Sequence, residues 1–224
     1  MVDPGAIRLV LMPGLDGTGM FFGPLIKALP PDVPRTVITY PDDENLSLKD
    51  HADFVAARLT GEDTVLVAES FSGLVALMLL HARPASVKGV IFSAAFAEAL
   101  YPIMIRTAAS IPGAASLARR LPARFLNVFF FHSYADKTLE KMLREALLKM
   151  GSDGLRQRAR LIAAGYPFPD DRFTLPCLYL QAAQDRVVPA GAADWFRSRF
   201  PSFDLLRLDA PHCLLQTRPA ESAD

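Results

Sequence analysis

The stretch VAESFSGLVA, residues 67–76, decides how the rest of the chain is interpreted. An apolar run ends in ESFSG and passes directly into LVAL, which predicts a buried strand that turns sharply into a helix. A serine on such a turn presents its hydroxyl beside the backbone N–H groups of the helix start, as a nucleophile requires. A polar turn without catalytic role is the alternative interpretation.

Packing at the turn distinguishes Ser70 from Ser72. In a turn of this kind the residues two before and two after the nucleophile face each other across crowded backbone, so both must be small. Around Ser70 these positions hold Ala68 and Ser72, whereas Ser72 has the large Leu74 on one side. The sequence therefore predicts Ser70 as the nucleophile and gives Ser72 a steric role.

Strand and helix patterns alternate along the chain, which predicts an α/β fold with a doubly wound, mostly parallel sheet. Short, nearly continuous apolar runs are typical of strands buried on both faces. About six are present: 7–12, 35–40, 64–68, 87–93, 177–181 and 204–208. Apolar residues spaced three and four apart predict the intervening helices, of which the second has Ser47 as its N-cap: 21–29, 48–60, 73–82 and 190–200.

Residues 97–170 break this alternation, because they are helical by pattern throughout. The expected helices are 100–110, 114–121, 137–150 and 152–164, with prolines between them. A helical insertion between two late strands is expected to form a cap over the sheet edge where open α/β folds bind ligands. An ordinary helical layer is the alternative. No linker divides the chain, so residues 1–224 are expected to form one domain that includes the cap.

A glycine-rich loop, PGLDGTG at residues 13–19, follows the first strand. It lacks the lysine of a Walker loop and the G-x-G-x-x-G spacing of a dinucleotide turn. Donation of backbone N–H groups to a developing oxyanion fits this loop better, with a structural turn as the alternative. The predicted donors are the N–H groups of Leu15 and Phe71.

Asp185 and His212 are the predicted partners of Ser70. Asp185 is the first acid after the strand at 177–181, although an Asp there is often only a turn former. His212 lies on the loop after the last strand, whereas the other histidines lie in predicted helices or in the cap: His51, His81 and His132. Since the carboxyl ends of parallel strands lie along one edge, the three side chains are expected to converge.

The order of oxyanion loop, serine, acid and histidine resembles that of the α/β-hydrolases, and the resemblance covers essentially all of the chain apart from the cap. It implies Ser70 as nucleophile, His212 as base and Asp185 as the acid that orients the base. The motifs PGLDGTG and AESF are similar to a group that includes plant plastid esterases and acyltransferases of lipid metabolism, in which a Glu also precedes the nucleophile. Both elbow glycines are replaced here, and residues 218–224 stand where a closing helix would begin.

These residues predict a serine hydrolase that cleaves carboxylic esters through an acyl-enzyme. No metal or organic cofactor is implied, because no Cys/His cluster has ligand spacing. Serine at the elbow argues against dehalogenase or epoxide hydrolase chemistry, which uses Asp there. Thioester hydrolysis and lipid acyl transfer would use the same residues, and a non-catalytic small-molecule receptor is the alternative of another class.

Apolar residues of the cap, above all Phe129, Phe130 and Phe131, predict a hydrophobic acyl or alcohol group in the substrate. The same residues would alternatively belong to the core or to a homodimer contact through the cap. Asp16 and Glu69, beside the predicted oxyanion loop and nucleophile, are further candidate substrate-binding residues.

Composition excludes other classes of partner. Lys plus Arg equals Asp plus Glu at 24 each and no basic run stands out, so neither nucleic acid nor an anionic membrane is an expected partner. The apolar stretches are shorter than the roughly 18 to 20 residues of a membrane span, and no signal peptide is read at the N-terminus. Cys177 and Cys213 are expected to be reduced thiols in a cytoplasmic protein.

Overall fold

The computed structural model describes residues 7–101, 103 and 123–224. In this part of the chain, six parallel strands form one sheet in the order β2-β1-β3-β4-β5-β6. The strands are β1 (Arg8–Met12), β2 (Arg35–Val37), β3 (Thr64–Glu69), β4 (Val87–Ser93), β5 (Cys177–Ala182) and β6 (Phe203–Leu208). The predicted parallel α/β sheet is therefore confirmed.

Strand β2 is shorter than the sequence predicts. The expected strand ran to Tyr40, but the backbone N–H of Tyr40 donates to the carbonyl of Gly17 at 2.8 Å instead of extending the pairing with β1. The chain after Val37 thus packs against the glycine-rich loop that follows β1.

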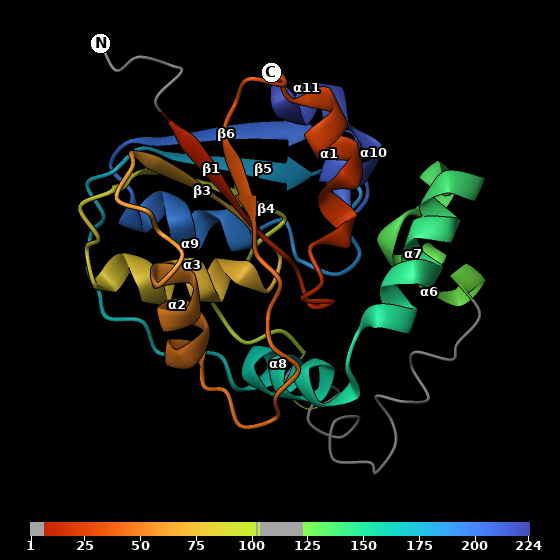
Figure 1. Cartoon of the computed structure of the whole chain (residues 1–224), viewed down its shortest axis with the longest axis horizontal. Coiled ribbons are helices and arrows are strands. Elements are labelled where there is room, and N and C mark those ends of the chain that lie inside the picture. The colour runs from red at the N-terminus through yellow and green to blue at the C-terminus, as the bar shows by residue number, and fades with distance from the viewer. Residues whose placement is uncertain (1–6, 102, 104–122) are drawn as a thin grey trace.

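Helices cover both faces of the sheet (Figure 1). One face carries α2 (Leu48–Ala56), α3 (Ser72–His81) and α9 (Ala192–Arg199); the other carries α1 (Gly23–Ala28), α10 (Leu214–Thr217) and α11 (Pro219–Ala223). Ser47 is the N-cap of α2, as predicted, and its side chain and that of Asp50 form a capping box. The last residues form the short α10 and α11, which pack on α1; α11 lies in the stretch where a closing helix would begin.

Alternate residues of each strand pack on opposite faces. In β1, Val10 and Met12 join the core under α2, α3 and α9, while Leu11 joins the core under α1 and α10. Leu66 and Val67 of β3 divide in the same way. Both faces of the central strands are therefore buried, which is why their sequences are nearly continuous apolar runs.

The segment between β4 and β5, residues 94–176, is here called the β4–β5 insertion. Its described helices are α6 (Ala123–Phe130), the 3-10 helix η3 (His132–Tyr134), α7 (Lys137–Lys149) and α8 (Ser152–Ala164). Helices α6 and α7 lie beside the sheet, at the end toward which the strands run (Figure 1). The predicted helices at 137–150 and 152–164 are confirmed and α6 is an addition, whereas those at 100–110 and 114–121 lie almost entirely outside the described residues.

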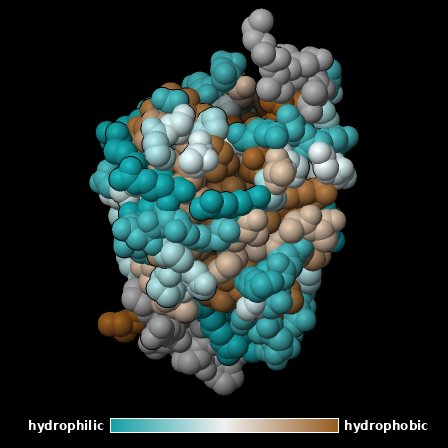
Figure 2. Space-filling model, turned by 90° about the vertical axis from the view of Figure 1, so that its left-hand side faces the viewer, coloured by the Kyte–Doolittle hydropathy of each residue, from teal (hydrophilic) through white to brown (hydrophobic). Residues whose placement is uncertain are grey.

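The side of the molecule away from α6 and α7 shows hydrophobic residues scattered between hydrophilic ones (Figure 2). Such scatter is ordinary on the surface of a folded domain. Among the described helices, none is both long enough and apolar enough to cross a bilayer.

The strand order brings the loops after β1, β3, β5 and β6 to one edge of the sheet. Strand β1 pairs with β2 on one side and β3 on the other, so the winding reverses between β1 and β3, and open α/β folds bind ligands at such a point. Met12 at the end of β1 pairs with Ala68 near the end of β3, and Ala182 pairs with Leu208 at the ends of β5 and β6. The loops after these four strands therefore open at the same edge.

Candidate active site

Ser70 occupies a strained turn between β3 and α3. Its backbone has φ 50°, in the left-handed region that non-glycine residues rarely adopt. The N–H of Ser70 donates to the carbonyl of Ser93 at 2.9 Å, which fixes the turn to the end of β4. A Cβ added to Gly73 would lie 2.8 Å from Ala95 Cβ, so this glycine lets α3 start against the chain after β4. This is the sharp strand-to-helix turn expected of a nucleophile.

Ser72 does more than the steric role predicted for it. Its buried hydroxyl donates to the carbonyl of Pro13 and lies 2.7 Å from the hydroxyl of Tyr40. Because the Pro13 carbonyl only accepts, the Tyr40 hydroxyl is the donor to Ser72. The side chain thus fastens the start of α3 to the glycine-rich loop, which small size alone would not do.

Ser70, His212 and Asp185 come together as predicted, from the loops after β3, β6 and β5. His212 Nε2 lies 3.1 Å from Ser70 Oγ, and His212 Nδ1 lies 2.9 Å from Asp185 Oδ2. The side chains of His212 and Asp185 are only 6% and 7% exposed. Asp185 Oδ1 also accepts from the N–H groups of Val187 and Val188, at 2.7 and 2.9 Å, so the carboxylate is held in one orientation. A serine, an imidazole and a carboxylate linked in this way can perform nucleophilic catalysis.

The N–H groups of Leu15 and Phe71 have the properties expected of oxyanion donors. Within the described part of the chain, neither donates to another protein group. Gly14 brings the loop close to the serine, because a Cβ added there would lie 3.5 Å from Ser70 Cβ. Phe71 directly precedes α3, so its N–H belongs to the positive end of that helix.

Arg158 of α8, which the sequence did not single out, holds the glycine-rich loop in place. Its Nε donates to the Leu15 carbonyl at 2.8 Å and its Nη2 to the Asp16 carbonyl at 3.0 Å, and the residue is 2% exposed. A Cβ added to Gly17 would lie 2.6 Å from the guanidinium carbon, so only glycine lets the arginine lie on this loop. The Asp42 carboxylate accepts from the N–H of Gly154 and so fixes the start of α8.

Two carboxyl groups lie beside the serine. Burial raises the pKa of Glu69 to about 7, against the lowering effect of the hydrogen bond that Gln216 Nε2 donates to Glu69 Oε1 at 2.8 Å. Burial also raises the pKa of Asp16, whose Oδ2 accepts from the N–H of Thr18 at 2.8 Å and from its hydroxyl. Gln216 of α10 was not predicted either; nothing in its local sequence distinguishes it from a surface residue.

A cavity of about 250 Å³ opens above Ser70. The predicted residues Leu15, Asp16, Glu69, Phe130 and His212 line it together with Ser70. The remainder of its wall is mostly apolar and comes largely from the β4–β5 insertion: Leu126, Leu143, Leu147, Met150, Leu155 and Ile162. None of the other three histidines is among the described residues that line it.

The three predicted phenylalanines do not share one environment. Phe130 lines the cavity, with its ring centroid 6.0 Å from that of His212. Phe131 is not among the lining residues: it is 0% exposed and packs against Phe21 in a small core with Leu139 and Leu143. Its placement in the substrate site is not supported, because consecutive residues at the end of α6 point in different directions. The side chain of Phe129 lies outside the described residues.

Within the described residues, no group of three or more His, Cys, Asp or Glu side chains is placed to hold a metal ion. Cys177 and Cys213 are both buried free thiols. Cys213 lines the cavity next to His212, and burial raises its pKa well above the ordinary value. The thiol is therefore kept protonated and is a poor nucleophile.

The parallel sheet, with a serine on the turn after β3 and an acid and a histidine after β5 and β6, defines an α/β-hydrolase fold. The model of the alpha/beta hydrolase family matches residues 9–224, and the chain belongs to this family. A search of curated proteins finds no match.

Solved structures with the same fold carry different activities. An enol-lactonase from Burkholderia xenovorans LB400 superposes with a TM-score of 0.81 at 17% identity, covering 97% of this chain and 88% of the other. An esterase from Exiguobacterium antarcticum gives 0.78 at 15% identity, with 96% and 88% covered. A bromoperoxidase from Bacillus anthracis gives 0.76 at 15% identity, with 97% and 89% covered. Identities this low show the shared fold alone.

Proposed function

We propose that this chain hydrolyses carboxylic esters that carry an apolar acyl or alcohol group. The observation that carries the proposal is the linked arrangement of Ser70, His212 and Asp185 on the floor of a largely apolar cavity. The positive φ of Ser70, 50°, supports a catalytic serine over a non-catalytic receptor, since strained backbone is often found at sites of chemistry.

In the proposed mechanism Ser70 Oγ attacks the ester carbonyl carbon while its proton passes to His212 Nε2. The N–H groups of Leu15 and Phe71 bind the oxyanion of the tetrahedral intermediate, and Asp185 stabilises the imidazolium that has formed. The intermediate collapses as the alcohol leaves with the proton from His212. Water then attacks the acyl-enzyme, again with His212 as base, and releases the acid and a free Ser70.

The experiment is a series of aryl esters from acetate to palmitate, combined with fluorophosphonate labelling and mass spectrometry. Ser70→Ala should reduce kcat by about a million-fold and abolish the adduct. Ser198→Ala, an exposed serine on α9, is the matched control and should keep both. Labelling on another serine, or an active Ser70→Ala variant, would refute the proposal.

Two further comparisons define the chemistry. His212→Ala should cost several orders of magnitude in kcat, whereas His132→Ala in η3 should not, and an equal loss would mean that the wrong histidine has been chosen. Supplying an alcohol with an ester or thioester donor, and identifying the products, separates hydrolysis from acyl transfer. Labelling without turnover of any ester would favour a receptor.

A further inference from the structure

The cavity has two chemically different ends. Toward the β4–β5 insertion its wall is apolar, from Leu126, Phe130 and Leu143 among others. The charged side chains among its lining residues are two acids, Asp16 and Glu69, and both lie next to the reacting groups in sequence and space. An entirely apolar ligand matches the first end only.

Glu69 is the last residue of β3 and is 5% exposed, so its carboxyl group is removed from bulk water. One oxygen, Oε1, accepts from Gln216 Nε2, which also donates to the Phe21 carbonyl at 3.2 Å. The other, Oε2, accepts from no described residue, yet it is not among the fully enclosed unpartnered atoms. Oε2 therefore keeps some exposed surface, and Glu69 is one of the residues that line the cavity.

Asp16 presents a second carboxyl oxygen beside the serine. Its Oδ2 accepts from the N–H and the hydroxyl of Thr18, whereas no described residue other than Asp16 itself donates to Oδ1. Oδ1 lies 3.9 Å from the point where a Cβ of Gly14 would stand, and Ser70 Cβ lies 3.5 Å from the same point. The Asp16 carboxyl group and the Ser70 side chain thus both border Gly14.

Buried polar groups that receive no hydrogen bond destabilise a complex, so these oxygens discriminate between ligands. An alkyl group against them would leave both without a partner. A hydroxyl is the best match, because it donates to an ionised carboxylate and can also accept from a protonated one. Burial raises the pKa of Glu69 to about 7, which makes this double capacity relevant near neutral pH at that residue. A ligand carboxylate would instead be repelled by an ionised acid.

We propose that the site takes an ester with an apolar chain on one side of the ester bond and a free hydroxyl close to that bond on the other side. The chain lies against the β4–β5 insertion, and the hydroxyl binds at Asp16 and Glu69. Monoesters of short diols and alkyl esters of hydroxy acids share this chemistry. The inference rests on the proposed ester hydrolysis and names the substrate class of the same site.

Two matched pairs of esters test it, each exchanging a hydroxyl for a methyl group. The first pair is 2-hydroxyethyl octanoate and propyl octanoate; the second is octyl glycolate and octyl propanoate. In at least one pair the hydroxyl ester should have the higher kcat/KM, by between about tenfold and a hundredfold. The pair that shows the preference identifies the side of the ester bond that carries the hydroxyl.

Glu69→Met then replaces the carboxyl group by an apolar side chain of similar length, and the preference ratio should fall to near one. The ratio is measured within one variant, so partial loss of folding does not change it. Glu145→Met makes the same exchange at an exposed position of α7 and should keep the wild-type ratio. If Glu69→Met does not fold, the preference for a hydroxyl is measured on the wild-type protein instead. The measurement compares the competitive inhibition constants of 1,2-octanediol and 1-octanol, and the diol should bind more tightly.

The outcomes separate the two proposals. If all four esters resist hydrolysis, or Ser70→Ala still cleaves them, the proposed function fails and this inference fails with it. If cleavage depends on Ser70 but the wild-type ratio is near one in both pairs, only the inference is overturned. A preference that survives Glu69→Met at full size would also overturn it, because the acidic end would not be its source.

Discussion

Replacing Arg158 by methionine tests whether the β4–β5 insertion positions the oxyanion loop. Methionine fills most of the space of the arginine stem but cannot donate to the carbonyls of Leu15 and Asp16. The loop would then be held mainly by Ser72 and by its own turns, and the Leu15 N–H would lose its fixed direction. We expect a lower kcat with little change in KM, because Arg158 is not among the residues lining the cavity.

The magnitude follows from the two hydrogen bonds, of 2.8 and 3.0 Å, that the 2%-exposed side chain makes. Each bond from a charged donor contributes about 1.5 to 3 kcal/mol. Removing the guanidinium also relieves the burial of a cation whose Nη1 has no partner among the described residues. The net loss in free energy of unfolding should therefore be about 2 to 4 kcal/mol. Complete loss of an oxyanion donor costs about 100- to 1,000-fold in kcat, so a misdirected one should cost about 10- to 100-fold.

The assay measures kcat and KM on an octanoate ester, with urea unfolding to establish that each variant is folded. Arg156→Met is the matched control: it is on the same helix, but it pairs with Glu44 and Asp153 at the surface, at 3.3 and 3.8 Å. Surface pairs of this kind contribute about 1 kcal/mol or less. Arg158→Lys should recover part of the kcat, because an ammonium can reach one of the two carbonyls. Equal kcat values for the folded Arg158→Met and Arg156→Met proteins would refute the positioning role.

Three further changes have defined outcomes. Ser72→Ala leaves the Pro13 carbonyl and the Tyr40 hydroxyl unpaired, so urea unfolding should show a loss of about 1 to 3 kcal/mol; unchanged stability would return Ser72 to a steric role. Phe130→Ala should lower the octanoate-to-acetate ratio of kcat/KM by an amount that corresponds to about 1 to 3 kcal/mol. Phe131→Ala should lower the free energy of unfolding and keep this ratio. The reverse pattern would mean that the cavity wall is misassigned. Because burial raises the pKa of Glu69 from 4.5 to about 7, the folded state retains a proton that the unfolded state releases. The contribution of Glu69 to the free energy of unfolding therefore falls by up to about 3 kcal/mol as the pH rises through this window. Urea unfolding at about pH 5 and about pH 8 should show this decrease in the wild-type protein and not in Glu69→Gln; the same decrease in both proteins would contradict the prediction.

The parts of the site that could be predicted from the sequence are those fixed by strand ends. Ser70 and Asp185 follow apolar runs that form the largely buried strands β3 and β5, and His212 follows the edge strand β6. A parallel sheet brings the ends of these strands to one edge. The small residues required around a strand-to-helix turn then separate Ser70 from Ser72. These are local constraints, so they can be recognised without knowing which helix packs where.

Arg158 and Gln216 could not be predicted because their importance depends on tertiary packing. Arg158 stands among other arginines in SDGLRQRARLIAA, and only the way α8 lies on the glycine-rich loop distinguishes it from Arg156. Gln216 acquires its role when α10 folds back over the end of β3. The hydrogen bonds of the Ser72 hydroxyl could not be predicted for the same reason, since Pro13 and Tyr40 are both distant in sequence. In each case the partner comes from another element, and periodicity carries no information about it.

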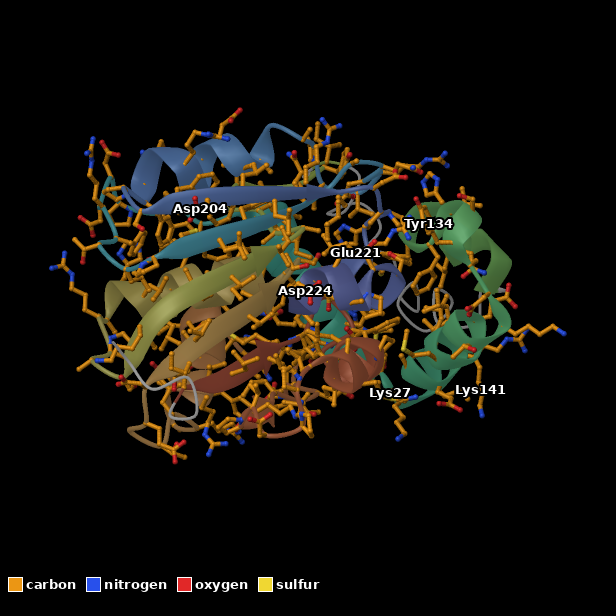
Figure 3. The ribbon with its side chains drawn as sticks, turned by 90° about the horizontal axis from the view of Figure 1, so that it is seen from above. Lys27, Tyr134, Lys141, Asp204, Glu221 and Asp224 are labelled. Carbon is orange, nitrogen blue, oxygen red and sulfur yellow. The ribbon has the colours of Figure 1, made fainter. Side chains whose placement is uncertain are left out.

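The β4–β5 insertion supports both halves of the site, which a lid over the cavity would not need to do. On one side α8 holds the carbonyls of Leu15 and Asp16 through Arg158. On the other, the Phe130 carbonyl of α6 accepts from the Cys213 N–H at 3.2 Å, directly after His212. Tyr134 of η3, which Figure 3 labels beside the helices of the insertion, donates to the Asp209 carbonyl at 2.9 Å in the same loop.

These contacts link the cavity wall to the reacting groups. Helices α6 and α8 each carry cavity-lining residues, Phe130 and Ile162 among them, and each also contacts a loop that carries catalytic groups in the proposed mechanism. A substrate chain that packs against these helices therefore stabilises the same elements that hold the oxyanion donor and the histidine. Binding energy from a part of the substrate remote from the ester bond can in this way improve the reacting geometry, which raises kcat as well as affinity. Esters with longer chains should accordingly have a higher kcat, up to the length that fills the cavity. If the insertion were only a passive lid, longer chains would lower KM and leave kcat unchanged.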